Sequence, residues 1–267
     1  MHILTRQVRF SIAPFLSDQP TGFNSYASKP AGGDGLSVFL ALWVDLEGPV
    51  EQQTGFVVNV STIDKAVRQH AVPVFTRSVQ DAFRHCRTLK LEELAGLLKQ
   101  VWKPIQEVFA AQILRQLRLD LNPYRYLAVQ AEDADMLIYS EKFEFSSMHK
   151  LWNEAFDAQS NFEHFGKCAN PAGHGHNYIL EVRVRKKIPQ AEQDWFCDFQ
   201  KVVAEEFLDL VDHKNLNADV PEFKSLNPTV ENLAFLAWEK LEGKFKNVTL
   251  CSITVWENDR TYCTYSR

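Results

Sequence analysis

The sequence predicts an α+β protein made of two tandem copies of one unit, each a four-stranded antiparallel sheet with two helices on one face. Two observations carry this prediction. Short motifs recur in the same order along the chain, which is typical of a degenerate duplication. Each copy also reads strand, strand, helix, helix, strand, strand. We place the copies at residues 1–139 and 140–267. The matching motifs are Arg9-Phe10-Ser11 with Glu144-Phe145-Ser146, Pro30-Ala31-Gly32 with Pro171-Ala172-Gly173, Leu91–Ala95 with Val230–Ala234, and Glu132-Asp133 with Glu257-Asn258.

Composition excludes several classes of protein. The 267 residues are 45% hydrophobic and 24% charged, as in an ordinary soluble globular chain. A net charge of -5 argues against a nucleic-acid-binding surface. The longest apolar run, about 38–44, is too short to cross a membrane, and the N-terminus carries no signal peptide. Five irregularly spaced cysteines do not form a disulfide framework. We therefore expect a cytoplasmic protein.

In the second copy, alternating apolar residues predict strands at about 142–148 and 178–185. A turn-prone stretch with Pro189 follows at 186–193. An apolar stripe predicts a helix over about 199–210, and Asn227-Pro228 predicts the start of another helix near Thr229. The chain is expected to end in a hairpin of 249–257 and 261–265.

The first copy has the same plan, with a strand at about 37–44 and a longer helical region. Pro104 lies in that region. Because proline lacks the backbone N–H that a helix needs, we expect Pro104 to break or restart a helix.

Histidines are concentrated in the second copy. Five of the eight lie between His149 and His213. His174 and His176 alternate at the start of a predicted strand, so both rings point to one side. His149 ends the preceding predicted strand and can add a third nitrogen if the two strands pair. Three histidines with an open fourth position suit a catalytic zinc ion.

Cys168 lies six residues before His174. It is either a fourth ligand of a structural zinc or a base or nucleophile beside a catalytic one, and spacing alone does not decide between them.

Other polar residues have a functional and a purely structural interpretation. Asp212 and His213 follow the first helix. They can transfer a proton as a pair, but a polar helix end is the simpler interpretation. Glu257 ends an apolar strand, where a carboxylate can accept two N–H groups of a heterocycle or simply lie at the rim of a hairpin. Glu231 is explained by the helix dipole.

Taken together, these segments resemble the 6-pyruvoyl tetrahydropterin synthase family, which includes the 6-carboxytetrahydropterin synthases. The matching pieces occur in family order across about 140–267. They are Phe143–His149, Lys167-Cys168 with His174–Tyr178, Asp212–Asn217, Pro228–Asn232 and Trp256-Glu257.

The resemblance implies a tunnelling fold (T-fold), in which copies close their sheets into a barrel within a homo-oligomer and the sites lie at interfaces between copies. It implies zinc on three histidines, and a small-molecule substrate, 7,8-dihydroneopterin triphosphate, rather than a nucleic acid or a membrane. The implied site consists of the zinc ligands His149, His174 and His176, the catalytic base Cys168 with its assistants Asp212 and His213, and the pterin-binding residues Glu257, Thr229 and Glu231.

The family has two reactions, and the spacing here favours one. Five residues separate Cys168 from His174, as in enzymes that eliminate triphosphate and form a pyruvoyl side chain. The alternative is a 6-carboxytetrahydropterin synthase of the queuosine (deazapurine) pathway. A protein of another class, a non-catalytic pterin- or purine-binding T-fold protein, stays as a third possibility. Asn258 stands where family members often have threonine.

The first copy departs from the family pattern. Pro14 stands in place of His149, and Gly33 and Gly35 stand in place of the histidine pair. Lys90 replaces Thr229, whereas Glu132 is aligned with Glu257. We therefore expect residues 1–139 to be a degenerate copy without a zinc site.

Overall fold

The computed structural model describes residues 1–15, 37–133, 135–188 and 195–267. The chain divides into two compact units. The first unit comprises residues 1–139 and 187–189, and the second comprises 140–186 and 190–267. The repeat at Pro30-Ala31-Gly32, the glycines Gly33 and Gly35, and most of the turn expected at 186–193 lie outside the described residues.

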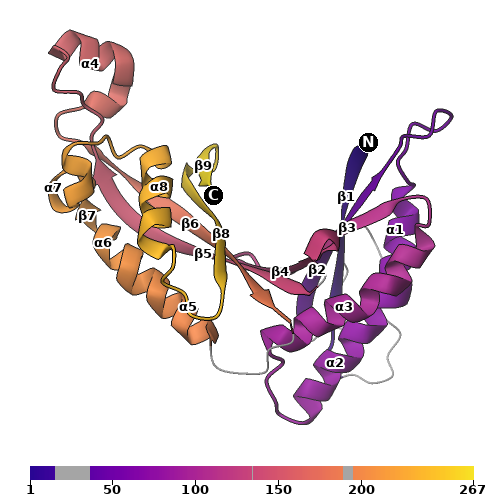
Figure 1. Ribbon diagram of the computed structural model, residues 1–267. Helices are drawn as coiled ribbons and strands as arrows, with labels where there is room; N and C mark the ends of the chain where they lie inside the picture. The colour runs from indigo at the N-terminus through magenta and orange to yellow at the C-terminus, as the bar shows by residue number, and fades with distance from the viewer. Residues whose placement is uncertain (16–36, 134, 189–194) are drawn as a thin grey trace. The chain divides into compact units, whose positions relative to one another are not determined.

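The first unit is a four-stranded antiparallel sheet in the order β1-β2-β3-β4, with helices on one face (Figure 1). This confirms the predicted order of elements. The elements are β1 (His2–Ile12), β2 (Val38–Gly48), α1 (Val60–Ala66), the π-helical segment η1 (Val67–Ala71), α2 (Val72–Arg84), α3 (Leu91–Val108), β3 (Ile113–Asn122), β4 (Arg125–Gln130) and the 3-10 turn η2 (Ala131–Asp133).

Helix α3 corrects one expectation, because Pro104 lies inside it and does not end it. Val101 and Ile105, on either side of the proline, are both buried, at 1% and 0% exposure. Their packing offsets the hydrogen bond that proline cannot donate, so the helix continues for another turn.

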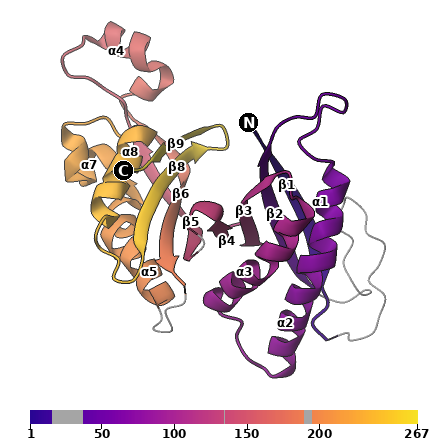
Figure 2. The same cartoon turned by 45° about the vertical axis from the view of Figure 1, so that its right-hand side comes forward.

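The second unit repeats the plan in the order β5-β6-β8-β9, with α5 and α8 on one face (Figure 2). Its elements are β5 (Met136–His149), α4 (Ala158–Phe165), the 3-10 turn η3 (Gly166–Ala169), β6 (His174–Lys187), α5 (Trp195–Val203), the π-helical segment η4 (Ala204–Leu208), α6 (Asp209–Val211), β7 (Lys214–Asn215), α7 (Leu216–Asp219), η5 (Pro221–Lys224), α8 (Val230–Leu241), β8 (Thr249–Asn258) and β9 (Thr261–Tyr265). The short β7 runs parallel to the end of β5.

Alternation along the strands builds the core of the second unit. Every second residue of β6 from Tyr178 onward is buried, as the two-residue period of a half-buried strand requires. The Tyr178 ring stacks on Phe145 of β5 with centroids 5.0 Å apart. Phe145 in turn meets Phe207 of η4 edge-on at 5.9 Å. These rings join the sheet to the helical layer within a few residues of His149 on β5 and His176 on β6.

The two units share irregular features as well as regular ones. In each, the first long helix contains a five-residue π-helical segment, η1 in the first unit and η4 in the second. In each, a non-glycine residue with positive φ follows the end of that helix. These residues are Cys86, with φ 49°, and His213, with φ 55°.

The terminal hairpins correct the alignment of Glu132. In β3–β4, Asn122 pairs with Arg125 after a register shift, as Asn258 pairs with Thr261 in β8–β9. In both, the asparagine side chain accepts a backbone N–H inside the turn. The counterpart of Glu257 is therefore Leu121, the residue before Asn122.

Glu132 lies in η2, beyond the hairpin, where its carboxylate accepts a hydrogen bond from Arg115 at 2.8 Å. The alignment of Glu132-Asp133 with Glu257-Asn258 rested on residue type alone, but the first pair lies in a 3-10 turn and the second ends a strand. The first unit thus offers no carboxylate at the position of Glu257.

None of the described helices combines the length and apolar character that crossing a bilayer requires.

Replacing Phe75 by alanine tests the core of the first unit. This α2 side chain is fully buried against Phe10 of β1. We expect the variant to lose about 3–5 kcal/mol in the free energy of unfolding, measured by urea titration, because a cavity remains in the core. The matched control is Phe39→Ala in β2, where the ring is 52% exposed. An equal loss in both variants would contradict the assignment of the core.

Candidate metal centre

His149 is the last residue of β5, and its ring is buried at 1% exposure. Its Nδ1 donates a hydrogen bond to the carbonyl of Pro228, 2.7 Å away, just before α8. A carbonyl can only accept, so this bond places the ring proton on Nδ1. The lone pair of Nε2 is left pointing toward the start of β6.

His174 and His176 open β6 and lie on the same face of the strand as Tyr178. The Nε2 atoms of His149 and His174 are 3.1 Å apart. One nitrogen from each of the three histidines lies within 4.8 Å of the others. Two neighbouring strands therefore bring three imidazole nitrogens to one point.

The donor set fits a metal ion. Nδ1 of His174 and Nε2 of His176 are buried without a hydrogen-bond partner among the described residues. Burial is the main cause that lowers the pKa of both His149 and His176, so these rings are held in the neutral form. Metal coordination requires neutral imidazole, and three nitrogens with one open position are typical of catalytic zinc.

A glycine makes the entry to β6 possible. Gly173 has φ 71° and immediately precedes His174. A Cβ atom there would lie 2.9 Å from the carbonyl oxygen of His149. The histidine pair can approach the end of β5 so closely because this position carries no side chain.

Glu257 lies beside the histidines. Its Oε1 is 3.5 Å from Nε2 of His149 and 3.5 Å from Nε2 of His176, and its side chain is 19% exposed. The antiparallel pairing of β6 with β8 places it there, since Trp256 is paired with Ile179. The carboxylate and the three rings thus belong to one site within the second unit.

Cys168 lies in η3, half-buried, and its carbonyl accepts the N–H of Leu151 at 2.9 Å. Burial, and then the charge of Glu257, raise the pKa of its thiol. A thiolate base needs a lowered pKa, and the chain's own groups have the opposite effect on Cys168. A cation bound at the histidines would lower the pKa of this thiol.

Asp212 and His213 form a pair after α6. His213 Nδ1 is 2.9 Å from Asp212 Oδ1, and the same oxygen accepts the N–H of Ser146 at 2.9 Å. The Ser146 N–H is the main cause that lowers the pKa of Asp212. The His213 side chain is 81% exposed. It lines a hollow together with His176, but no contact among the described residues joins the pair to Cys168.

The other two predicted pterin-binding residues have local roles. The hydroxyl of Thr229 accepts the N–H of Asn232 and caps α8. Glu231 is exposed in the first turn of α8, where the helix dipole favours a carboxylate. No contact within the described part of the chain joins Glu231 to the histidines.

Sequence reasoning missed the Pro228 carbonyl that orients His149. The Asn227-Pro228 pair was interpreted only as a helix start signal, and a backbone carbonyl leaves no mark in a pattern of side chains.

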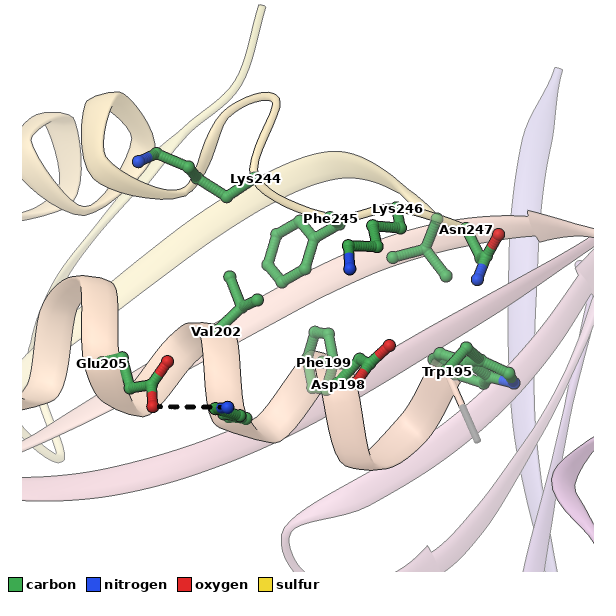
Figure 3. Close-up of a pocket in the computed structure, with 11 residues that line it drawn as sticks. Trp195, Asp198, Phe199, Val202, Glu205, Lys244, Phe245, Lys246 and Asn247 are labelled. Atoms are coloured by element: carbon green, nitrogen blue, oxygen red, sulfur yellow. Dashed lines mark ion pairs between the residues drawn. The ribbon is translucent and has the colours of Figure 1, made fainter. Parts of the chain in front are cut away.

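A second hollow in this unit lies between α5 and the loop before β8 (Figure 3). Its lining includes the stacked rings of Phe199 from α5 and Phe245 from the loop, whose centroids are 5.4 Å apart. Its rim carries charges of both signs, including the ion pair of Lys201 with Glu205 at 3.8 Å. The lining holds no histidine or cysteine. The metal centre is therefore the stronger candidate for chemistry.

Comparison with known proteins gives one consistent family. Residues 138–267 match the family model of 6-pyruvoyl tetrahydropterin synthase. The human 6-pyruvoyl tetrahydrobiopterin synthase is 35% identical over 128 residues, which is 47% of this chain and 88% of that protein. A Caenorhabditis elegans protein described as a putative 6-pyruvoyl tetrahydrobiopterin synthase is 38% identical over 45% of this chain and 88% of its own length.

A solved structure of the Caenorhabditis elegans 6-pyruvoyl tetrahydropterin synthase is 34% identical, with a TM-score of 0.46, and the match covers 49% of this chain and 96% of that one. The identities above 30% across most of the length of the relatives, with the match confined to the half that carries the three histidines, make this chain a member of the 6-pyruvoyl tetrahydropterin synthase family.

Proposed function

We propose that the chain is a zinc-dependent lyase of the 6-pyruvoyl tetrahydropterin synthase type, which acts on 7,8-dihydroneopterin triphosphate through its second unit. The observation that carries this proposal is the convergence of three imidazole nitrogens beside one carboxylate, that of Glu257. The relatives that bear the name of this activity support the choice of reaction.

His149, His174 and His176 would hold the zinc ion. Zinc bound there supplies Lewis-acid polarisation of the oxygens on the substrate side chain. The chain itself prepares the ligands, because the Pro228 carbonyl fixes the ring orientation of His149 and burial lowers the pKa of His149 and His176.

Cys168 is the proposed base. Its thiolate takes a carbon-bound proton from the substrate side chain. The electron pair of the broken C–H bond forms a double bond as the C–O bond to triphosphate breaks, and triphosphate leaves. Proton shifts then convert the resulting enol to a ketone, and oxidise the remaining side-chain carbinol to a second ketone while the C=N bond of the ring is reduced, so no external oxidant or reductant is needed. Burial, and then the charge of Glu257, raise the pKa of the Cys168 thiol in the free chain. Pairing that carboxylate with the N–H groups of a bound pterin ring would reduce this opposition, which couples substrate binding to base strength.

Glu257 is the proposed anchor of the pterin ring, since a carboxylate can accept two parallel N–H donors. Thr229 and Glu231 are the further pterin contacts that the family resemblance implies. Both lie at the start of α8, next to the carbonyl that orients His149.

Asp212 and His213 are proposed to assist Cys168 of another chain. Within one chain this pair contacts the edge of β5 and leaves the His213 ring exposed. A homo-oligomer with sites at interfaces between copies, closed into a barrel, would bring the pair of one second unit to Cys168 of another. Residues 1–139 then serve as a structural copy without zinc ligands.

Zinc content tests the metal centre. We expect His149→Ala to weaken zinc binding by at least about 100-fold, because removing an outer partner alone costs 10- to 100-fold. Zinc per chain is measured by elemental analysis after dialysis, and affinity by chelator competition. The control is His164→Ala, whose exposed α4 ring contacts the Ser160 carbonyl and the Phe156 ring and is not part of the three-histidine cluster. Equal zinc in both variants would reject the three-histidine site.

Product analysis tests the reaction. Zinc-loaded protein is given 7,8-dihydroneopterin triphosphate, and products are identified by mass. We expect a 6-pyruvoyl tetrahydropterin and free triphosphate, both absent with Cys168→Ala but present with Cys197→Ala, a change at an exposed α5 thiol. A 6-carboxy product would reassign the reaction. No turnover by folded, zinc-bound protein would leave a pterin-binding protein instead.

Mixing two inactive variants tests the shared site. Cys168→Ala and His213→Ala chains are unfolded together, refolded and assayed. If the two residues act from different chains, random mixing restores about a quarter of the wild-type activity per chain, since a quarter of the sites regain both groups. Activity that stays at the level of the separate variants would place both residues in one chain.

A further inference from the structure

The segment that leaves the end of β5 links the first metal ligand to the proposed base. Lys150, Leu151 and Trp152 follow His149 directly, and outside any helix or strand the backbone of such a segment has no regular hydrogen-bond partners. Yet this segment sets the distance between His149 and Cys168, because Leu151 donates its N–H to the carbonyl of Cys168 at 2.9 Å.

Two asparagine side chains hold the segment on either side of that bond. The N–H of Lys150 donates to Oδ1 of Asn217 at 2.7 Å, and Nδ2 of Asn217 donates back to the carbonyl of Lys150 at 2.9 Å. The N–H of Trp152 donates to Oδ1 of Asn227 at 2.8 Å. Three successive backbone N–H groups are therefore all satisfied, the outer two by side chains from α7 and from the turn before α8.

Asn227 is itself held in place. Its carbonyl accepts Nδ2 of Asn232 at 2.8 Å and the N–H of Thr229 at 2.8 Å. The next residue, Pro228, carries the carbonyl that orients the His149 ring. The Asn227-Pro228 turn thus holds two neighbouring parts of the chain. The backbone carbonyl of Pro228 orients the His149 ring, and the side chain of Asn227 holds the segment that follows His149.

We infer that Asn217 and Asn227 are positioning residues for the site: they clamp Lys150–Trp152 and so hold Cys168 at a fixed place relative to His149. Their side chains act on the backbone of Lys150 and Trp152, so the role assigned to them is positioning and not contact with substrate or metal. Each is separated by more than sixty residues of sequence from the segment it holds. The inference rests on the metal site proposed above for its functional meaning, but the clamp itself is a feature of the protein without metal.

The two asparagines differ in a way that sharpens the test. Asn227 acts only as an acceptor among the described contacts of its side chain, so aspartate can replace it. Asn217 both accepts and donates. Aspartate there keeps the bond from the Lys150 N–H but turns a carboxylate oxygen toward the Lys150 carbonyl, where two acceptors repel each other. The clamp therefore predicts that aspartate is tolerated at Asn227 and not at Asn217.

The experiment measures the alkylation rate of Cys168 by iodoacetamide in the metal-free full-length chain, by peptide mass spectrometry. Cys197, an exposed thiol, is the internal reference. We expect Asn217→Leu, Asn227→Leu and Asn217→Asp to raise the rate at Cys168 about fivefold, the factor expected from one lost hydrogen bond. We expect Asn227→Asp to stay near the wild-type rate.

Zinc affinity gives the second readout. The three loosened variants are expected to bind zinc 10- to 100-fold more weakly, as outer partners of metal ligands do, and to lower kcat more than they change KM. The control is Asn59→Leu, which removes the N-cap of α1, an Asn oxygen that accepts the N–H of Ser61 at 2.9 Å. It lowers stability but leaves both readouts unchanged.

The inference would be overturned if the three loosened variants had the same alkylation rate at Cys168 and the same zinc affinity as the wild-type chain. If the leucine variants do not fold, the contrast between Asn217→Asp and Asn227→Asp decides it, and equal behaviour of the two would overturn it. A wild-type chain that binds no zinc would reject the proposed metal site instead, while the alkylation rates still report on the clamp.

Discussion

The hydrogen bond from His149 to the carbonyl of Pro228 is the interaction on which the site depends. It joins the end of the sheet to the start of α8, and it settles which nitrogen of a buried ring faces the other histidines. A buried imidazole that could flip would leave either a polar atom unsatisfied or a ligand turned away. Strand pairing brings the three histidines close together, but the hydrogen bond to Pro228 orients the His149 ring so that its free nitrogen faces the other two.

The two units share a fold but not the residues of the metal centre. Both have the same order of strands and helices and the same asparagine-capped terminal hairpin. The chemical residues differ, since Leu121 stands where the second unit has Glu257. Burial of apolar strand and helix faces requires apolar side chains, so one apolar residue can replace another in the core. A site of three imidazole nitrogens requires histidine at each position, so a substitution there removes a ligand.

The limits of sequence reasoning follow the same division. Periodicity predicted the strands, the helical layer and the hairpin because burial repeats every two residues in a strand and about every 3.6 in a helix. The alternation of His174 and His176 predicted their common face for the same reason.

What sequence reasoning missed was set by tertiary contacts. Burial of Val101 and Ile105 carries α3 through Pro104, and the true partner of Glu257 appears only in the hairpin register. The hydrogen bonds of Asn217 and Asn227 join segments far apart in the chain, and no local pattern encodes them.

The paired π-helical segments show that the two units share a departure from regular helix geometry. A π turn arises when one residue is inserted into an α-helix, and such turns are rare. Both units carry one in the same helix, followed in each by a non-glycine residue with positive φ. The helix continues for 13 residues after η1 and for only 3 residues after η4, so the helix of the second unit ends sooner and brings Asp212 and His213 to the end of β5. The shared irregularity therefore sits in the scaffold that both units have in common, whereas the metal ligands belong to the second unit alone.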